Sequence, residues 1–160
     1  MTGQNVVIGV GDRFRRDAGA GPAVVSLLRG RLTGVRLVTC DNEPTTLIDL
    51  WSGARLAVVI HAVRAVDGQV GRVHRLSAQH PAATRTGIAH SHLAGLGDAV
   101  ALARSLDLMP ASLLLLAVQV DDVGMGIGLS PAVQRAVRRI ADEVTVLVSS
   151  NCVRVAPPTI

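Results

Sequence analysis

Hydrophobic and polar positions alternate along this chain with two different periods, and the alternation predicts a sheet interleaved with helices. Short apolar runs rich in β-branched residues are typical of buried strands, and they occupy residues 6–10, 35–39, 56–60 and 113–120. Apolar residues recur every three or four positions in the segments between and after them, as in one-sided helices, at residues 23–32, 44–53, 91–103 and 131–144. Strands that alternate with helices predict an α/β fold, a three-layer sandwich with about five strands, mostly parallel, and helices on both faces.

Two of the predicted strands differ in polarity, and this difference predicts their places in the sheet. Residues 70–76 mix apolar positions with Arg72, His74 and Arg75, which is typical of an exposed edge strand. Residues 113–120 form the most apolar run of the chain, so we expect this strand at the centre of the sheet. Residues 77–87 are polar and contain Pro81, which predicts a loop.

Length and composition fit a single packed domain. The chain has 160 residues, of which 49% are hydrophobic and 18% charged, a balance that favours a globule over disorder. We therefore predict one domain over residues 1–160, with 153–160 as a frayed tail. The start lacks the basic segment of a signal peptide, and no apolar run approaches the ~20 residues of a membrane span. These features predict a cytoplasmic protein that does not contact a membrane.

The charge pattern argues against a nucleic-acid partner. All 16 basic residues are arginine, set against 12 acidic residues, for a formal net charge of +4. The arginines are spread along the chain, and aromatic residues, on which unpaired bases stack, make up only 1% of it. Cys40 and Cys152 lie far apart without a CxxC spacing, so neither a disulfide framework nor a thiolate zinc site is predicted.

The loop after the first strand is rich in glycine but lacks the pattern that binds a nucleotide. In a dinucleotide fingerprint that starts at Gly9, the sixth position must be glycine so that the helix can pack closely, and Phe14 occupies it. A phosphate-binding GxxxxGK[ST] loop is excluded because the chain has no lysine. No nucleotide cofactor is predicted.

The same loop resembles the N-terminal signature of a known protease family. Gly9-x-Gly11, followed by Arg15-Arg16-Asp17-x-Gly19-x-Gly21, is similar to the corresponding loop of the hydrogenase maturation proteases. Further stretches resemble the same family in the same order, at residues 57–64, 91–96 and 118–133. The resemblance implies an endopeptidase that trims the C-terminal extension of a nickel–iron hydrogenase large-subunit precursor, with nickel carried by that precursor and with the precursor as its partner.

The resemblance also implies which positions hold the metal. Members of the family use an acid just after the loop aspartate, an aspartate at the end of the third strand and a histidine that opens a later helix. In this chain these positions are Ala18, His61 and His92, so one agrees with the family and two are altered. Asp17, His61 and His92 are the predicted catalytic residues, and His61 and His92 the predicted metal ligands.

Several alternatives follow from the altered positions. An imidazole can replace a carboxylate on nickel or zinc, and His61, His90 and His92 together would resemble a catalytic zinc site, with Asp17 or Asp12 orienting a ligand. Equally, His90 can be a solvent-facing loop residue and His61 a buried histidine at a strand end. The functions that remain open are a metal-dependent endopeptidase, a non-catalytic module that binds the precursor, and a small-molecule site on the same scaffold. The oligomeric state is not predicted.

Overall fold

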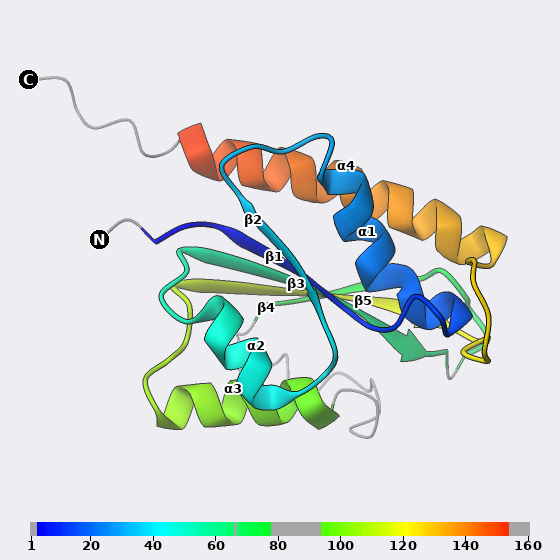
Figure 1. Cartoon of the computed structure of the whole chain (residues 1–160), viewed down its shortest axis with the longest axis horizontal. Helices are drawn as coiled ribbons and strands as arrows, with labels where there is room; N and C mark the ends of the chain where they lie inside the picture. The colour runs from blue at the N-terminus through cyan, green and yellow to red at the C-terminus, as the bar shows by residue number, and fades with distance from the viewer. Residues whose placement is uncertain (1–2, 66, 78–93, 154–160) are drawn as a thin grey trace, which may run out of the picture.

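A computed structural model shows the predicted sandwich and describes residues 3–65, 67–77 and 94–153 (Figure 1). Its sheet has five strands in the order β2-β1-β3-β5-β4. Four of them are parallel, β1 (Val6–Val10), β2 (Arg36–Cys40), β3 (Leu56–Arg64) and β5 (Ser112–Val120), and β4 (Val73–Ser77) is antiparallel to β5. The prediction of an α/β sandwich with a mostly parallel sheet is confirmed, and so is the edge position of the polar strand.

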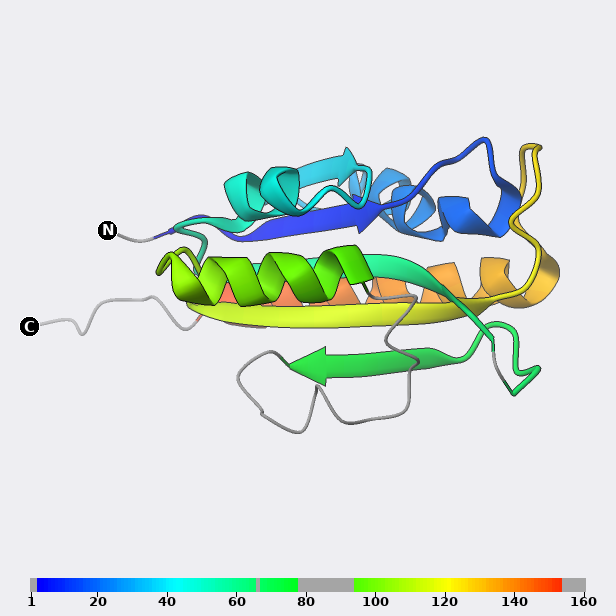
Figure 2. The same ribbon diagram turned by 90° about the horizontal axis from the view of Figure 1, so that it is seen from below.

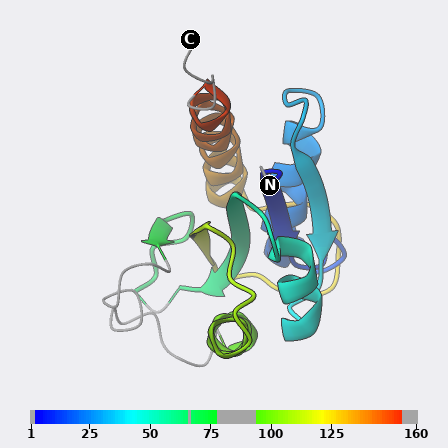
Figure 3. The same cartoon turned by 90° about the vertical axis from the view of Figure 1, so that its left-hand side faces the viewer.

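Helices cover both faces of this sheet, and the alternation of side chains along the strands explains how (Figure 3). Val7 of β1 packs with α1 (Ala20–Leu28) and α4 (Pro131–Val153) on one face. Its neighbour Ile8 packs with α2 (Pro44–Trp51) and α3 (Ala94–Ser105) on the other. Because successive strand residues point to opposite faces, strands that are apolar throughout bury both sides of the sheet.

The order of the strands corrects one expectation. The most apolar strand, β5, lies inside the sheet but next to the edge strand β4, and β3 is the central strand. An apolar run indicates that a strand is buried on both faces, and every interior strand of the sheet is buried in this way. Which interior strand lies at the centre depends on the pairing of distant segments, which the apolar pattern does not predict. Figure 2 shows β4 at the margin of the sheet beside β5.

The central strand is also longer than its pattern predicts. Residues 56–60 were expected to form it, but β3 continues to Arg64 because its pairing with β5 extends to Arg64 and Val120. On its other side the pairing with β1 stops at Ile60, opposite Gly9. Beyond that point β3 has a paired neighbour on one side only, which opens space at the carboxyl end of the sheet.

Two glycines place the loop after β1 close to this opening. A Cβ atom on Gly21 would lie 2.5 Å from the carbonyl oxygen of Val10, so only glycine lets α1 start directly against the end of β1. Gly11 has a φ of +143°, in the region that favours glycine. The chain therefore turns sharply after β1 and returns through the 3₁₀ helix η1 (Arg16–Gly19) into α1.

Some predictions fall outside the described residues. These are the polar loop beyond Ser77, the start of the later helix around Ser91, and the two histidines His90 and His92. Of the predicted tail, Val153 ends α4 and the remainder also lies outside. Within the described ranges, no helix has both the length and the apolar character needed to cross a membrane.

Candidate functional site

The order of the strands determines where a ligand site is expected. The chain passes from β1 to β2 on one side and then to β3 on the other, so the topology switches direction between β1 and β3. In open α/β sheets the crevice outside the carboxyl ends of such a pair is the usual place for a ligand. A pocket of about 440 Å³ lies at this position, within the usual size range of small-ligand sites.

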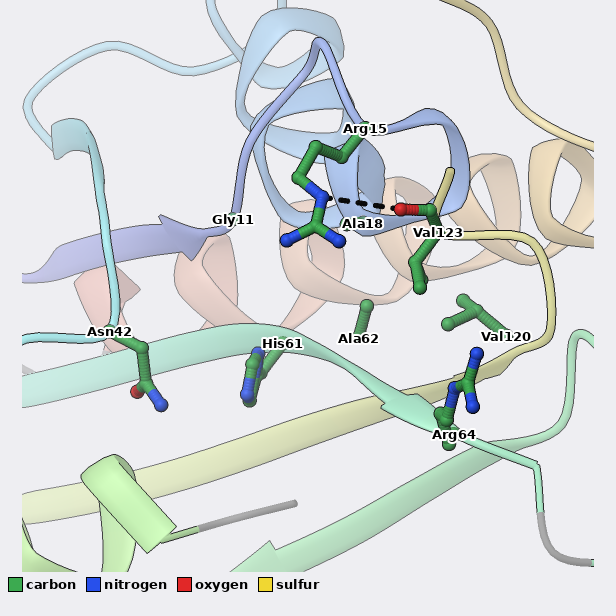
Figure 4. Close-up of a pocket in the computed structure, with 9 residues that line it drawn as sticks. All are labelled: Gly11, Arg15, Ala18, Asn42, His61, Ala62, Arg64, Val120 and Val123. Atoms are coloured by element: carbon green, nitrogen blue, oxygen red, sulfur yellow. Dashed lines mark hydrogen bonds between the residues drawn. The ribbon is translucent and has the colours of Figure 1, made fainter. Parts of the chain in front are cut away.

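The pocket is built from segments that follow or end four different strands (Figure 4). The loop after β1 and the loop after β2 contribute lining residues, and so do the last four residues of β3, the end of β5 and the loop that follows β5. Its lining residues are Gly11, Arg15, Ala18, Asn42, His61, Ala62, Arg64, Val120 and Val123.

His61 is the predicted site residue that the structure places in this pocket. It lies within β3, opposite Ala117 of β5, rather than after the end of the strand as its pattern suggested. Its Nδ1 atom is buried and has no hydrogen-bond partner among the described residues. Burial lowers the pKa of His61 from 6.5 to about 4, so the imidazole is neutral at neutral pH. A neutral ring with an unpartnered nitrogen can accept or donate a hydrogen bond, or ligate a metal.

Ala18 lines the same pocket and limits what the site can hold. A methyl group cannot ligate a metal, and within the described ranges no three His, Cys, Asp or Glu side chains are grouped as a metal site would need. Among the described residues, the pocket therefore offers a metal one imidazole, that of His61. His90 and His92, which sequence reasoning adds to this set, lie outside those residues.

Asp17 does not line the pocket. Its side chain is only 1% exposed, and its two carboxylate oxygens accept hydrogen bonds from the backbone N–H of Ser130 at 2.7 Å and from the Ser130 hydroxyl at 2.8 Å. Ser130 immediately precedes α4, so a carboxylate at this position also benefits from the positive end of the helix dipole. The contacts of Asp17 tie the first loop to the start of α4.

Asp12 is not among the lining residues of the pocket either. Its Oδ1 atom accepts a hydrogen bond from the backbone N–H of Phe14 at 2.9 Å, which stabilises the turn of the first loop. The structure thus brings His61 to the pocket and gives Asp12 and Asp17 hydrogen bonds within or next to the loop after β1, which contributes lining residues.

Sequence reasoning missed three polar residues of the pocket: Arg15, Asn42 and Arg64. Arg15 follows β1, Asn42 follows β2 and Arg64 ends β3, so each stands where strands reach the carboxyl edge. That position was a usable signal. Arginine and asparagine are common at exposed strand ends, so residue type alone does not mark them as parts of a site.

The loop after β1 is held in place by a second loop. Arg15 and Gly126 form an isolated parallel bridge, in which the N–H of Arg16 donates to the Gly126 carbonyl at 3.0 Å and the N–H of Gly126 to that of Phe14 at 2.8 Å. The glycine-rich segment after β5 is therefore tied to the first loop in this structure. These contacts are typical of a tight connection rather than of a flap over the pocket.

Comparison with known proteins identifies a family and solved structures that resemble this chain. A family model described as hydrogenase maturation protease matches residues 24–146. No curated protein matches the chain in sequence. Among solved structures, the hydrogenase maturating endopeptidase HybD from Escherichia coli is 21% identical with a TM-score of 0.77, covering 92% of this chain and 93% of that one.

A second solved structure agrees. The [NiFe] hydrogenase maturation protease HybD from Thermococcus kodakarensis is 20% identical with a TM-score of 0.75, and the match covers 91% of this chain and 99% of that one. At this identity the likeness shows the shared fold, and the family model, which spans most of the chain, shows the family. On the strength of that match and of the motifs that led to it, the chain belongs to the hydrogenase maturation protease family.

Proposed function

We propose that this protein is an endopeptidase that removes the C-terminal extension of a nickel–iron hydrogenase large-subunit precursor, and that His61 contacts the nickel which the precursor carries. One observation supports the proposal most strongly: His61 lines the pocket at the topological switch point, and its buried Nδ1 atom has no hydrogen-bond partner among the described residues. The membership of the chain in the maturation protease family supplies the substrate class. The proposal also includes the cytoplasmic location predicted from the sequence.

The low pKa of His61 suits this contact. A metal binds the neutral imidazole, and a ring whose pKa is about 4 has no proton to lose at neutral pH. Nickel delivered by the substrate would polarise the scissile carbonyl and position the attacking water. Ala18 adds no ligand, so we expect the precursor to be held less firmly than by a site with an acid at this position.

A second candidate function has its own observation. The methyl group of Ala18 lies in the pocket lining, where the family resemblance implies an acid. A protein that keeps the fold and pocket but holds the metal too weakly to cut would bind the precursor without cleaving it. Cleavage and binding therefore have to be measured separately.

The first experiment follows cleavage of a nickel-loaded precursor by intact mass spectrometry, with binding measured in parallel by surface plasmon resonance. The double variant Ala18→Glu/His61→Asp restores the acids that the family resemblance implies. It should cleave on the order of 10²-fold faster than the wild type, because improved positioning of a reacting bond by about 1 Å has an effect of this size. Arg36→Gln, at the opposite end of the neighbouring strand β2, is the control and should match the wild type.

Each outcome of this experiment separates the candidates. Efficient cleavage by the wild type and slower cleavage by the double variant would mean that the histidine-containing site works as it stands. Binding of the precursor without cleavage by either protein would favour the non-catalytic module. If neither protein binds or cleaves the precursor, the proposed function is wrong.

A second experiment tests the metal contacts without the precursor. Calorimetric titration of nickel and of zinc into the wild type should show weak binding, since a single described ligand holds a metal poorly. His61→Ala and His92→Ala should each reduce the heat further. A trace for His92→Ala identical to that of the wild type would separate His92 from metal binding.

A further inference from the structure

Both charged side chains in the pocket lining are cationic. Arg15 and Arg64 line it, and no carboxylate does. The remaining titratable lining residue, His61, is neutral at neutral pH because burial lowers its pKa to about 4. Among the described residues, the pocket therefore carries positive charge that no acidic lining residue balances.

The two guanidinium groups are also available to a ligand. The Nε atom of Arg15 donates to the Val123 carbonyl at 3.2 Å, which orients the side chain and leaves its terminal amino groups without a partner among the described residues (Figure 4). The side chain of Arg64 forms no hydrogen bond or ion pair with any described residue. A guanidinium group donates in a planar fork that matches the two oxygens of a carboxylate.

Two carboxylates close to the pocket loops, those of Asp17 and Asp122, have other partners. Asp17 accepts both hydrogen bonds of Ser130, as described above. Asp122 lies 3.5 Å from Arg16 and accepts a hydrogen bond from the N–H of Gly124 at 3.1 Å. Among the described residues, neither pocket arginine forms an ion pair with a carboxylate.

The pocket has a second unmet requirement at its other end. The Oδ1 atom of Asn42 is buried and has no hydrogen-bond donor among the described residues, and a buried amide oxygen needs one. Figure 4 shows Asn42 and His61 toward one end of the pocket and Arg64 toward the other, with Arg15 reaching in from the loop above. A fitting ligand therefore combines an anionic group with an N–H donor some distance away.

We infer that this pocket binds the C-terminal end of a peptide, with its α-carboxylate between Arg15 and Arg64 and a backbone N–H donating to Oδ1 of Asn42. A peptide end supplies both groups on one chain, and a pocket of about 440 Å³ has room for a few residues. The inference rests on the proposed function in one respect, that the natural peptide belongs to the precursor. The carboxylate site itself depends on Arg15 and Arg64, which have no part in the proposed contact with the metal.

The test uses a probe that contains no hydrogenase sequence. Acetyl-Val-Val-Val with a free C-terminal carboxylate is titrated into the ¹⁵N-labelled full-length protein, and amide shifts are followed by NMR, alongside the same peptide with a C-terminal amide and alongside acetate. The free acid should bind at least about tenfold more tightly than the amide. Arg15→Gln and Arg64→Gln should each weaken binding of the acid about five- to tenfold, and Arg36→Gln should leave it unchanged.

Further arms refine the assignment. Asn42→Ala should weaken binding of the tripeptide acid. It should leave the weak binding of acetate unchanged, because acetate has no N–H to donate. Competition by the excised extension or by the shortened large subunit shows which natural end carries the carboxylate. Equal binding of acid and amide peptides, loss of binding in Arg36→Gln as large as in Arg64→Gln, or no saturable shift up to about 10 mM peptide overturns the inference.

These results can be told apart from failure of the proposed function. If the tripeptide does not bind but the precursor is cleaved, only the carboxylate site is wrong. If the tripeptide binds as expected and the precursor is neither bound nor cleaved, the pocket recognises peptide ends and the hydrogenase substrate is wrong.

Discussion

Asp17 and His61 are two polar side chains near the same carboxyl edge of the sheet, and they differ in how their polar atoms are used. Both oxygens of the Asp17 carboxylate accept hydrogen bonds from Ser130, and the side chain is buried. The imidazole of His61 has a buried Nδ1 atom to which no described residue is hydrogen-bonded, and burial lowers the pKa of the ring to about 4. Among the described residues, the polar atoms of Asp17 therefore have hydrogen-bond partners, and the Nδ1 atom of His61 has none.

This contrast distinguishes a structural group from a group kept for a ligand. A buried polar atom that lacks a partner costs free energy, so folding alone gives no reason to retain it. A bound ligand that completes the missing contact supplies such a reason. Asp17 therefore supports the first loop and the start of α4, and His61 is the side chain that we propose for the chemistry of the pocket.

The largest expected effect tests the structural side of the comparison. Asp17→Ala removes two charge-assisted hydrogen bonds and leaves the Ser130 donors without an acceptor, so the free energy of unfolding should fall by about 2–4 kcal/mol. Urea unfolding followed by circular dichroism measures this loss. Asp17→Asn keeps an acceptor oxygen and should lose less.

The matched control is Asp142→Ala, which removes an exposed carboxylate paired with Arg31 and should change the free energy of unfolding by no more than about 1 kcal/mol. A loss below about 1 kcal/mol in Asp17→Ala would contradict the structural role. Loss of cleavage in a fully stable Asp17→Asn would instead indicate direct participation in the reaction.

The next effect concerns the pH dependence of stability. In the unfolded chain His61 takes up a proton near pH 6.5, whereas in the folded protein it does so only near pH 4. The unfolded state therefore binds more protons between these values, and the contribution of His61 to the free energy of unfolding falls by on the order of 2–3 kcal/mol as the pH drops from 6.5 to 4. This contribution is fully present above pH 6.5.

Chemical unfolding of the wild type and of His61→Leu at several pH values measures the effect as a difference between two curves. The curve of His61→Leu should decline less steeply over this interval, and at pH 7 the variant should be as stable as the wild type or more so, because it buries no unpartnered nitrogen. Parallel curves would show that the imidazole titrates normally and is not desolvated.

The smallest effect compares Asp17 with a carboxylate in a similar bonding arrangement at the surface. Glu143 of α4 accepts two hydrogen bonds from Arg75 of β4, and this contact lowers the pKa of Glu143 and raises that of Arg75. Because both side chains reach solvent, Glu143→Gln should cost less than about 1 kcal/mol of unfolding free energy, and the loss should shrink further in 1 M salt. A loss as large as that of Asp17→Ala would mean that burial does not explain the difference between the two carboxylates.

The sequence predicted much of the scaffold because local patterns encode it. The apolar runs of β1 and β5, the helical spacing of α4 and the pair Ser130-Pro131 before it depend on neighbours a few residues away. The extent of β3 was underestimated, because its last four residues, His61 to Arg64, are held in the strand by pairing with β5. That partner lies some fifty residues further along the chain, where a local pattern gives no information.

The residues of the candidate site were also predicted only in part from the sequence. Motif resemblance was enough to select His61, and composition was enough to exclude a phosphate-binding loop. The sequence alone also determined the alternation of strands and helices and the replacement of an acid by Ala18, because residue type and spacing carry this information directly. The tertiary structure decided which polar groups share the pocket: it turned Asp17 toward Ser130, left His61 and Asn42 with unpartnered buried atoms, and brought Arg15 and Arg64 to one cavity. The physical reason is that hydrogen bonding and burial depend on contacts between segments far apart in the chain, and these contacts exist only once the strand ends meet at one edge of the sheet.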